Sequence, residues 1–371
     1  MKYYIIAGEA SGDLHGSNLV HQLNLMDPHA DIRCWGGDLM KAEGGNLVKH
    51  YKDLAFMGFI EVVKNLPTIL KNLSFCKKDI EQYNPDVIVL IDYPGFNIKI
   101  AEWAKEKNYK VVYYISPQVW AWKEKRVHTI KKTVDLMLVI LPFEKEYYKK
   151  FDFDVVYVGH PLVEVIERFK SSFHKPIETG KKIIALLPGS RKQEINTKLP
   201  IMLGVTKSFP DYQFVVAKAP GLTTDFYMPF MQPYSNVSMV SNQTYQLLNQ
   251  ASAALVTSGT ATLETALFGV PEVVCYKGNP ISYAIAKRVI KIKYISLVNL
   301  IMAKPVVKEL IQDDLTEENC TMELQALLYD ENRRSQLKQD YADLAVLLSQ
   351  GGHASANAAK RIYKFVTSGS K

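Results

Sequence analysis

Residues 183–191 read Ile-Ile-Ala-Leu-Leu-Pro-Gly-Ser-Arg, and residues 253–264 read Ala-Ala-Leu-Val-Thr-Ser-Gly-Thr-Ala-Thr-Leu-Glu. Each stretch begins with an apolar run typical of a buried strand and continues into a small, hydroxylated turn. The amino end of a helix favours negative charge, and glycine lets a phosphate approach the backbone closely. The two stretches therefore predict strand–turn–helix units of an α/β protein, with an anion bound at the turns.

The same alternation of apolar runs and helical patterns extends over most of the chain. The first series of runs is Tyr3–Ala7, Val87–Ile91, Val111–Ile115 and Leu136–Leu141. The second series is Ile183–Leu187, Gln213–Ala217, Ala253–Val256 and Val270–Tyr276. Apolar strands between helices predict parallel sheets that are covered on both faces. We therefore expect two doubly wound, Rossmann-like domains whose carboxyl strand ends face each other across a cleft.

The domain boundaries follow from composition. Residues 162–180 are polar and charged and predict a linker, which separates an N-terminal domain at 1–165 from a C-terminal domain at 181–340. Residues 341–371 include an alanine-rich stretch and predict a helical segment. We expect this segment to pack back on the N-terminal domain or on a partner chain.

The composition is that of a globular protein with an anionic partner. Hydrophobic residues make up 47% of the 371 residues and charged residues 22%, which argues against disorder. The formal net charge of +7 suits nucleic acid, acidic lipid or a sugar nucleotide. The four cysteines form no C-x-x-C pair, which is typical of reduced thiols in a cytosolic protein.

Several kinds of segment and site are not expected. Tyr3–Ala7 is too short for an export signal, and no stretch approaches the ~20 apolar residues of a transmembrane helix. The eight histidines form no H-E-x-x-H cluster, and Asp152-x-Asp154 reads as a turn before a strand, so we expect no metal and no cofactor. The basic residues form no recognised nucleic-acid module.

The first turn of the chain differs in charge from the later two. Gly8–Asp13 carries Glu9 and Asp13, which would repel a phosphate, and it lacks the G-x-G-x-x-G pattern of nicotinamide sites. The turn after Leu187 instead carries Arg191 and Lys192. We therefore expect a nucleotide in the second domain and a group that is deprotonated or hydrogen-bonded in the first.

Seven short motifs lie in order between residue 3 and about residue 312. They are Gly8–Asp13 (GEASGD), Ile91–Asn97 (IDYPGFN), Ile115–Trp122 (ISPQVWAW), Leu141–Lys145 (LPFEK), Leu187–Arg191 (LPGSR), Ser258–Glu264 (SGTATLE) and Ser296–Leu300 (SLVNL). Each motif alone is weakly specific, but the seven in this order resemble the lipid-A-disaccharide synthase family.

The resemblance implies a two-domain GT-B glycosyltransferase fold and a defined reaction. In that reaction 2,3-diacylglucosamine passes with inversion from UDP to 2,3-diacylglucosamine 1-phosphate (lipid X). The products are the β-1,6-linked disaccharide 1-phosphate and UDP. The resemblance also implies a role in lipid A biosynthesis and a cytoplasmic, peripheral place on the inner face of the cytoplasmic membrane.

Asp92 is the leading candidate for the catalytic base. It directly follows the buried run Val87–Ile91, and open α/β sheets bind ligands at the carboxyl ends of their strands. It also matches the catalytic aspartate of the family. The alternative is a structural role, as a helix N-cap or in a turn before Pro94. The family motif often carries a second acid where this chain has Gly95, so the motif does not by itself support two cooperating carboxylates.

Glu9 and Asp13 are the other two acidic candidates. In one interpretation they orient the acceptor or share in proton transfer. In the other they cap the helix that begins near Ser11.

The UDP site is expected at the two turns of the second domain. The guanidinium of Arg191 can bind two phosphate oxygens, although a surface ion pair with Glu194 is the alternative. Glu264 lies one turn into its helix and is expected to accept the ribose hydroxyls, the alternative being interaction with the helix dipole alone. The other predicted UDP contacts are Gly189, Ser190, Ser258, Gly259, Thr260 and Asn299, the last carried over from the family.

An apolar stretch from Phe56 to Leu73 is the candidate site for acyl chains and membrane lipid. Its large apolar residues recur at close to helical spacing, and lysines such as Lys64 and Lys71 are interleaved, which is typical of a membrane-surface helix. An ordinary core-facing helix is the alternative, and Pro67 predicts two short helices. The predicted contacts are Met57, Phe59, Ile60, Val63, Leu66 and Leu70.

Two other functions remain open from the residues. A UDP-N-acetylglucosamine 2-epimerase or another GT-B sugar-nucleotide enzyme would account for the turns but not for the apolar stretch. A non-catalytic module that binds nucleotide or lipid at a membrane surface would account for both but would show no turnover.

Overall fold

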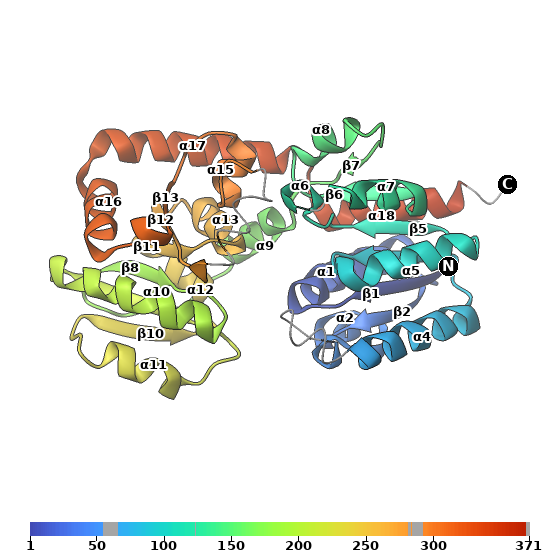
Figure 1. Cartoon of the computed structure of the whole chain (residues 1–371), viewed down its shortest axis with the longest axis horizontal. Coiled ribbons are helices and arrows are strands. Elements are labelled where there is room, and N and C mark those ends of the chain that lie inside the picture. The colour runs from blue at the N-terminus through green and yellow to red at the C-terminus, as the bar shows by residue number, and fades with distance from the viewer. Residues whose placement is uncertain (55–65, 123, 281–282, 284–291, 369–371) are drawn as a thin grey trace. The chain divides into compact units, whose positions relative to one another are not determined.

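The computed structural model describes residues 1–54, 66–122, 124–280, 283 and 292–368. The chain forms two compact units (Figure 1). The first unit consists of Met1–Pro161 and Leu348–Lys371, and the second of Leu162–Leu347.

The first unit is built on a parallel seven-stranded sheet with the order β3-β2-β1-β4-β5-β6-β7. The strands are β1 (Lys2–Ala7), β2 (Asp31–Gly36), β3 (Asn46–His50), β4 (Val87–Ile91), β5 (Val111–Tyr114), β6 (Leu136–Val139) and β7 (Val156–Tyr157). Alternate residues of β1 enter separate apolar clusters: Tyr4 and Ile6 belong to one, and Tyr3 and Ile5 to the other. Both faces of this sheet are therefore buried, as the sequence predicted.

Helices cover both faces of the first sheet. They are α1 (Ala10–Met26), α2 (Asp38–Ala42), α4 (Leu66–Tyr83), α5 (Pro94–Glu106), α6 (Val119–Trp122), α7 (Arg126–Thr133), α8 (Glu144–Lys149) and α18 (Ala354–Thr367), with a 3₁₀ turn at Tyr51–Asp53. Ala358 and Ile362 of α18 pack in the apolar cluster that also contains Leu19 and Leu23 of α1. The last helix of the chain therefore belongs to the core of the first unit.

The second unit is built on a parallel six-stranded sheet with the order β10-β9-β8-β11-β12-β13. The strands are β8 (Lys182–Leu187), β9 (Tyr212–Lys218), β10 (Val237–Ser241), β11 (Ala251–Thr257), β12 (Glu272–Tyr276) and β13 (Lys308–Ile311). The helices are α9 (Pro161–Lys170), α10 (Lys192–Gly204), α11 (Thr224–Met231), α12 (Thr244–Leu248), α13 (Thr260–Leu267), α15 (Leu297–Met302), α16 (Glu317–Tyr329) and α17 (Glu331–Ser349), with 3₁₀ turns at Val205–Ser208 and Gln312–Asp314.

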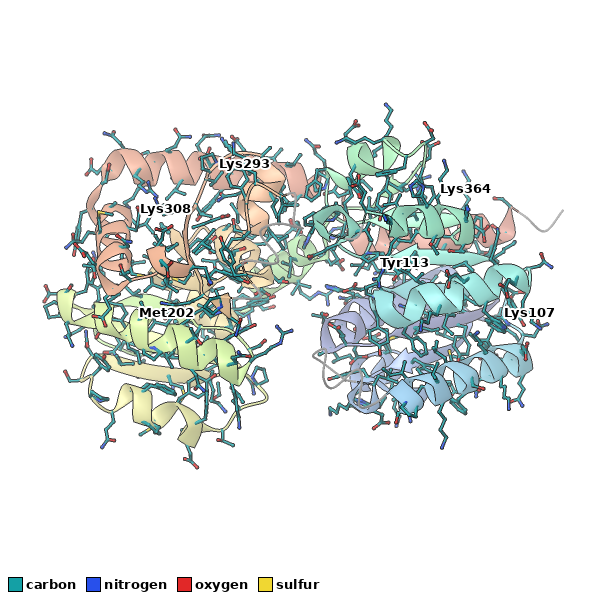
Figure 2. The ribbon with its side chains drawn as sticks, in the orientation of Figure 1. Lys107, Tyr113, Met202, Lys293, Lys308 and Lys364 are labelled. Carbon is teal, nitrogen blue, oxygen red and sulfur yellow. The ribbon has the colours of Figure 1, made fainter. Side chains whose placement is uncertain are left out.

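Burial follows side-chain chemistry in both units. Tyr113 of the first unit and Met202 of the second are fully buried, whereas Lys107 and Lys364 are exposed (Figure 2). This distribution is what the hydrophobic effect requires of the apolar runs in the sequence.

One local prediction was wrong. The stretch at 162–180 is not a linker throughout, because helix α9 occupies Pro161–Lys170. Pro67 is the second residue of α4, and residues 55–65 before this helix lie outside the described part of the chain, so the predicted division into two helices stays a prediction. The first turn of a helix tolerates proline, since the backbone N–H groups there have no partner within the helix.

Glu272 is an ionisable residue inside the second unit. It begins β12 with no exposed surface, and neither carboxyl oxygen has a hydrogen-bond partner among the described residues. Burial raises the pKa of this carboxyl well above its ordinary value. The folded chain therefore keeps Glu272 protonated at pH values where the unfolded chain ionises it.

We expect the Glu272→Gln variant to unfold at a higher temperature than the wild-type chain at pH 8. Because its folded pKa is raised, the stability contributed by Glu272 is fully present below about pH 4.3 and is lost as pH rises. The free-energy difference at pH 8 is expected to be on the order of 1–3 kcal/mol, because keeping a carboxyl protonated costs about 1.4 kcal/mol for each pH unit between its ordinary pKa and its raised pKa. Thermal unfolding of both chains at pH 5 and pH 8 measures this difference. If the stability gained by Glu272→Gln were not larger at pH 8 than at pH 5, Glu272 would not have the raised pKa.

Candidate functional site

Glu9 and Asp92 lie at the carboxyl edge of the first sheet. Strands β1 and β4 pair in parallel with Ala7 beside Ile91, and each acid follows its strand within two residues. Burial, and then the nearby charge of Glu9, raises the pKa of Asp92 to about 6. The structure therefore brings these two predicted acids together and makes Asp92 a stronger base than an ordinary aspartate.

The turn that carries Asp92 has an unusual backbone. Asp92 and Tyr93 have φ angles of 43° and 48°, in the left-handed region that costs non-glycine residues about 1–2 kcal/mol each. The carbonyl oxygen of Asp92 accepts hydrogen bonds from Asn97 Nδ2 at 2.8 Å and from the Tyr113 hydroxyl at 2.6 Å. Buried polar side chains thus hold a strained conformation, which is typical of functional sites.

The absence of a side chain at Gly8 leaves room for the aromatic ring of Tyr93. A Cβ atom at Gly8 would lie 2.3 Å from two atoms of that ring. The close contact with the Tyr93 ring thus explains why the motif has glycine at this position. Gly95, in contrast, is exposed at the start of α5, and a Cβ atom there would meet nothing within 4 Å.

Asp13 is engaged by backbone groups. Its carboxylate is buried and accepts hydrogen bonds from the N–H groups of Gly37 (2.7 Å), Met40 (3.1 Å) and Leu39 (3.2 Å). These groups lie at the amino end of α2, where the backbone N–H groups need acceptors. Asp13 therefore has a structural task at a neighbouring helix, whereas Glu9 makes no capping hydrogen bond to α1.

Two buried residues that follow β5 and β6, Ser116 and Glu144, were not singled out from the sequence. Ser116 Oγ and the Tyr148 hydroxyl form a hydrogen bond of 2.7 Å, and Glu144 Oε2 accepts one of 3.0 Å from Leu141 N–H. Burial raises the pKa of Glu144 to about 7. Ser116 directly follows the apolar run Val111–Ile115, and Glu144 lies three residues after the run Leu136–Leu141. Both residues belong to the quoted motifs, and their position after a strand is the signal that points to them.

The two predicted anion turns lie next to each other in the second unit. Strands β8 and β11 pair in parallel with Leu187 beside Val256, so both turns leave the carboxyl edge of the same sheet. Gly189 and Gly259 have φ angles of 117° and 143°, a region that strains residues with a side chain. A helix begins three residues after Gly189 (α10) and one residue after Gly259 (α13).

Arg191 and Ser258 have protein partners at these turns. The guanidinium of Arg191 forms an ion pair of 3.0 Å with Glu194, and its side chain is 64% exposed. The hydroxyl of Ser258 donates to the carbonyl oxygen of Ile295 at 2.9 Å. The ion pair considered from the sequence is thus present, and its exposure leaves the guanidinium accessible to solvent.

Glu264 lies on α13 one turn after the second glycine. The Tyr245 hydroxyl donates a hydrogen bond of 2.9 Å to its Oε1 atom. Burial raises the pKa of the Glu264 carboxyl. The residue is therefore oriented by a specific partner, beyond any interaction with the helix dipole.

Asn299 is buried, and its amide is occupied within the protein. Its Nδ2 atom donates to Val307 O and to Glu309 Oε1, both at 2.9 Å, and its Oδ1 atom accepts from Val307 N–H at 2.9 Å. Glu309 also accepts from the backbone N–H groups of Ile295 and Ser296. Asn299 therefore stabilises the loop that Ser258 binds.

Most of the predicted membrane contacts lie outside the described residues: Met57, Phe59, Ile60 and Val63. Leu66 begins α4, and only its backbone is described. Leu70 is 52% exposed and Phe75 47% exposed on the same helix. The other face of α4 contributes Leu73 and Ile80 to the core, so this helix is both core-facing and apolar at the surface.

The described residues contain no helix long and apolar enough to cross a membrane. They also contain no group of three or more histidine, cysteine, aspartate or glutamate side chains arranged to hold a metal ion.

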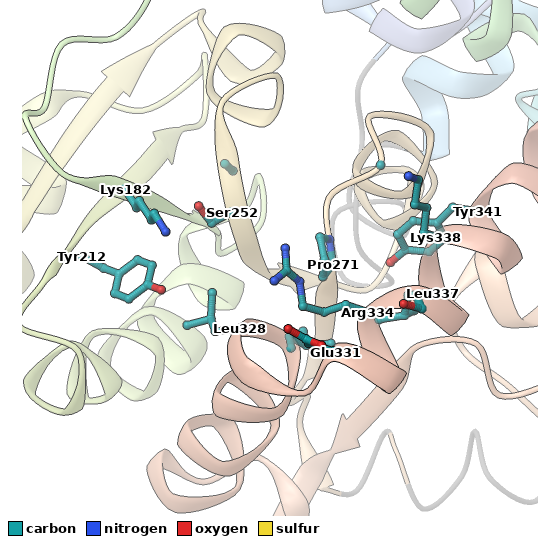
Figure 3. Close-up of a pocket in the computed structure, with 14 residues that line it drawn as sticks. Lys182, Tyr212, Ser252, Pro271, Leu328, Glu331, Arg334, Leu337, Lys338 and Tyr341 are labelled. Carbon is teal, nitrogen blue, oxygen red and sulfur yellow. The ribbon is translucent and has the colours of Figure 1, made fainter.

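A cavity of about 650 Å³ opens in the second unit, with Lys182, Arg334 and Lys338 in its lining (Figure 3). Lys182 begins β8, and Pro271 in the same lining immediately precedes β12. The cavity therefore lies at the amino edge of the sheet, opposite the two turns, and is separate from the predicted UDP site.

Comparison with known proteins gives a full-length match. The profile of a family described as lipid-A-disaccharide synthetase matches residues 3–363. A lipid-A-disaccharide synthase of Syntrophus aciditrophicus is 39% identical, covering 94% of this chain and 94% of its own length. One of Coxiella burnetii is 36% identical, covering 98% of both chains. The chain belongs to the lipid-A-disaccharide synthase family. It is therefore a glycosyltransferase of lipid A biosynthesis.

Solved structures support the fold that this family membership implies. A UDP-N-acetylglucosamine 2-epimerase from Neisseria meningitidis, bound to UDP-N-acetylglucosamine, matches 99% of this chain and 100% of its own with a TM-score of 0.67 at 13% identity. A calicheamicin glycosyltransferase matches 100% of this chain and 99% of its own with a TM-score of 0.61 at 16% identity. The predicted GT-B fold class is confirmed.

Proposed function

We propose that this lipid-A-disaccharide synthase family member transfers 2,3-diacylglucosamine from UDP-2,3-diacylglucosamine to lipid X with inversion, releasing UDP. The observation that carries the proposal is Asp92, a carboxylate in a strained turn at a carboxyl strand end, with a pKa of about 6. Such a group is ionised at neutral pH and is still basic enough to accept a proton.

In this mechanism Asp92 removes the proton from the 6-hydroxyl of lipid X as that oxygen attacks the anomeric carbon. The negative charge of Glu9 raises the proton affinity of Asp92, which improves it as a base. Asn97 and Tyr113 hold the Asp92 carbonyl and thereby fix the turn. Asp13 keeps the neighbouring helix α2 in place and takes no proton.

The second unit is proposed to hold the leaving group. The backbone N–H groups after Gly189 and Gly259 lie at helix amino ends, which favour phosphate oxygens. Ser190 and Thr260 add hydroxyls to the same turns. Arg191 exchanges its bond to Glu194 for the diphosphate, and its charge stabilises the negative charge that develops as UDP departs.

Glu264 is proposed to bind the ribose. Ser258 and Asn299 are proposed to stabilise the loop behind the nucleotide. Glu264 carries an acceptor oxygen that Tyr245 orients by hydrogen bonding. Ser258 and Asn299 act through the backbone of residues 295–299, because their polar atoms bind that loop and its neighbours. The first unit thus serves the acceptor and the second serves UDP.

We further propose that α4 contacts the cytoplasmic membrane surface, where both lipid substrates reside. Leu70 and Phe75 are about half exposed, and Lys71 and Lys78 are exposed on the same helix. Apolar side chains beside lysines are typical of helices that bind anionic lipid.

Replacing Leu70 and Phe75 together by serine is expected to weaken binding to vesicles of anionic phospholipid by about 10- to 100-fold. A fully inserted large apolar side chain contributes about 1.5–3 kcal/mol, and each of these two is about half exposed. Met322→Ser is the matched control, because Met322 on α16 is 57% exposed. Vesicle co-sedimentation measures the effect. Equal binding of the double variant and the wild-type chain would refute the α4 surface.

The reaction itself is tested with purified chain, UDP-2,3-diacylglucosamine and lipid X in detergent. We expect equimolar disaccharide 1-phosphate and UDP, with chelator present. Conversion of unacylated UDP-N-acetylglucosamine to its 2-epimer would instead favour the epimerase. UDP binding without turnover of either substrate would favour the non-catalytic module.

A further inference from the structure

Lys198 is a buried lysine in the second unit. It lies on α10, its side chain is 3% exposed, and its Nζ atom donates a hydrogen bond to Thr257 Oγ1. A lysine ammonium has three N–H donors, and this bond uses one of them. No carboxylate in the described part of the chain forms an ion pair with it.

The position of Lys198 joins the two anion turns. Its helix, α10, is the one that the Gly189–Arg191 turn opens. Its partner, Thr257, is the last residue of β11 and is followed directly by Ser258 and Gly259 of the second turn. The Lys198 side chain thus connects the helix that follows the first turn to Thr257, the residue directly before Ser258 of the second turn.

The charge of Lys198 has little compensation inside the protein. The titratable groups that face it are Glu194 on its own helix, Arg191 directly before that helix and Cys275 on β12. Glu194 already binds Arg191, and the interaction with the Cys320 thiol, followed by burial, raises the pKa of the Cys275 thiol, so that thiol is neutral. Removing an ammonium from water without a paired anion is unfavourable, and a bound dianion would relieve that cost.

We propose that Lys198 is a second cation of the nucleotide site, which orients the Ser258–Thr260 turn through Thr257 and supplies positive charge to the diphosphate of the sugar nucleotide. The proposal rests on the UDP site described under the proposed function. Lys198 is thus a positioning residue, which acts through its hydrogen bond to Thr257 and through the electrostatic field of its ammonium group. The proposal also accounts for a buried ammonium at a carboxyl strand edge, where α/β sheets bind ligands.

The test compares the affinities of UDP and uridine for the wild-type chain and for Lys198→Met by calorimetry. Methionine keeps the length of the side chain and removes its charge. We expect UDP affinity to fall by about tenfold or more, whereas the affinity for uridine stays unchanged, because uridine lacks phosphate. We also expect the unliganded variant to unfold at the same temperature as the wild-type chain or a higher one, which a merely structural lysine would not allow.

A second variant, Thr257→Val, removes the hydrogen bond and keeps the ammonium. Its UDP affinity is expected to fall by a few-fold, less than that of Lys198→Met. Raising the pH from 7 towards 10 should weaken UDP binding more in the wild-type chain than in Lys198→Met, since only the former loses this charge. Equal UDP affinities of the wild-type chain and Lys198→Met, or an equal loss for uridine, would overturn the inference. Absence of UDP binding to the wild-type chain would overturn the proposed UDP site itself.

Discussion

Replacing Asp92 by asparagine is expected to lower kcat by about 10²–10⁴-fold, the usual contribution of a general base. The variant should fold normally, because asparagine tolerates the left-handed backbone at this position and the carbonyl bonded by Asn97 and Tyr113 is retained. UDP affinity should not change, since the proposed UDP contacts all come from the second unit. Steady-state kinetics and UDP calorimetry measure the two quantities.

The pH profile of the wild-type chain gives an independent check on Asp92. A base with a pKa of about 6 is protonated below that pH, so kcat/KM should fall as pH decreases through about 6. Glu9→Gln removes the charge that raises the pKa of Asp92, so its acidic limb should move to lower pH. Retained turnover in Asp92→Asn, or a limb that Glu9→Gln does not move, would contradict this assignment.

Replacing Arg191 by methionine is expected to weaken UDP binding by about 10- to 100-fold. Hydrogen bonds to charged groups contribute about 1.5–3 kcal/mol, and 1.4 kcal/mol corresponds to a tenfold change. Stability should hardly change, because the Arg191–Glu194 pair is exposed and surface ion pairs contribute little. Calorimetric titration with UDP and with uridine measures the effect.

Glu194→Gln is the matched control for Arg191. It removes the competing carboxylate from the guanidinium, so UDP affinity should be unchanged or higher. If Arg191→Met and Glu194→Gln weakened UDP binding equally, the ion pair would be a structural element of the turn and Arg191 would not be a phosphate ligand.

The parts of the fold that the sequence predicted well are the central strands. Val87–Ile91 and Ile183–Leu187 are continuous apolar runs because both faces of each sheet are covered. The edge strands Asn46–His50 and Val237–Ser241 were not predicted, since they are partly exposed and carry polar residues. A periodicity argument has no apolar run to detect in such strands.

The candidate site divides in a similar way. Position at a strand end predicted Asp92 and Glu9, and the structure places the two together. The sequence could not predict that Asp13 and Asn299 use their polar atoms inside the protein, because their partners at Gly37 and Val307 come from other elements. Lys198 escaped notice because burial of a lysine on a helix is a property of tertiary packing.

The most direct test of the proposed reaction is the anomeric configuration of the disaccharide made from UDP-2,3-diacylglucosamine and lipid X. In a single displacement with Asp92 as base, the acceptor oxygen replaces UDP with inversion. Nuclear magnetic resonance of the purified product should therefore show a β-1,6 linkage. A product with the α configuration, or no disaccharide at all, would contradict the account.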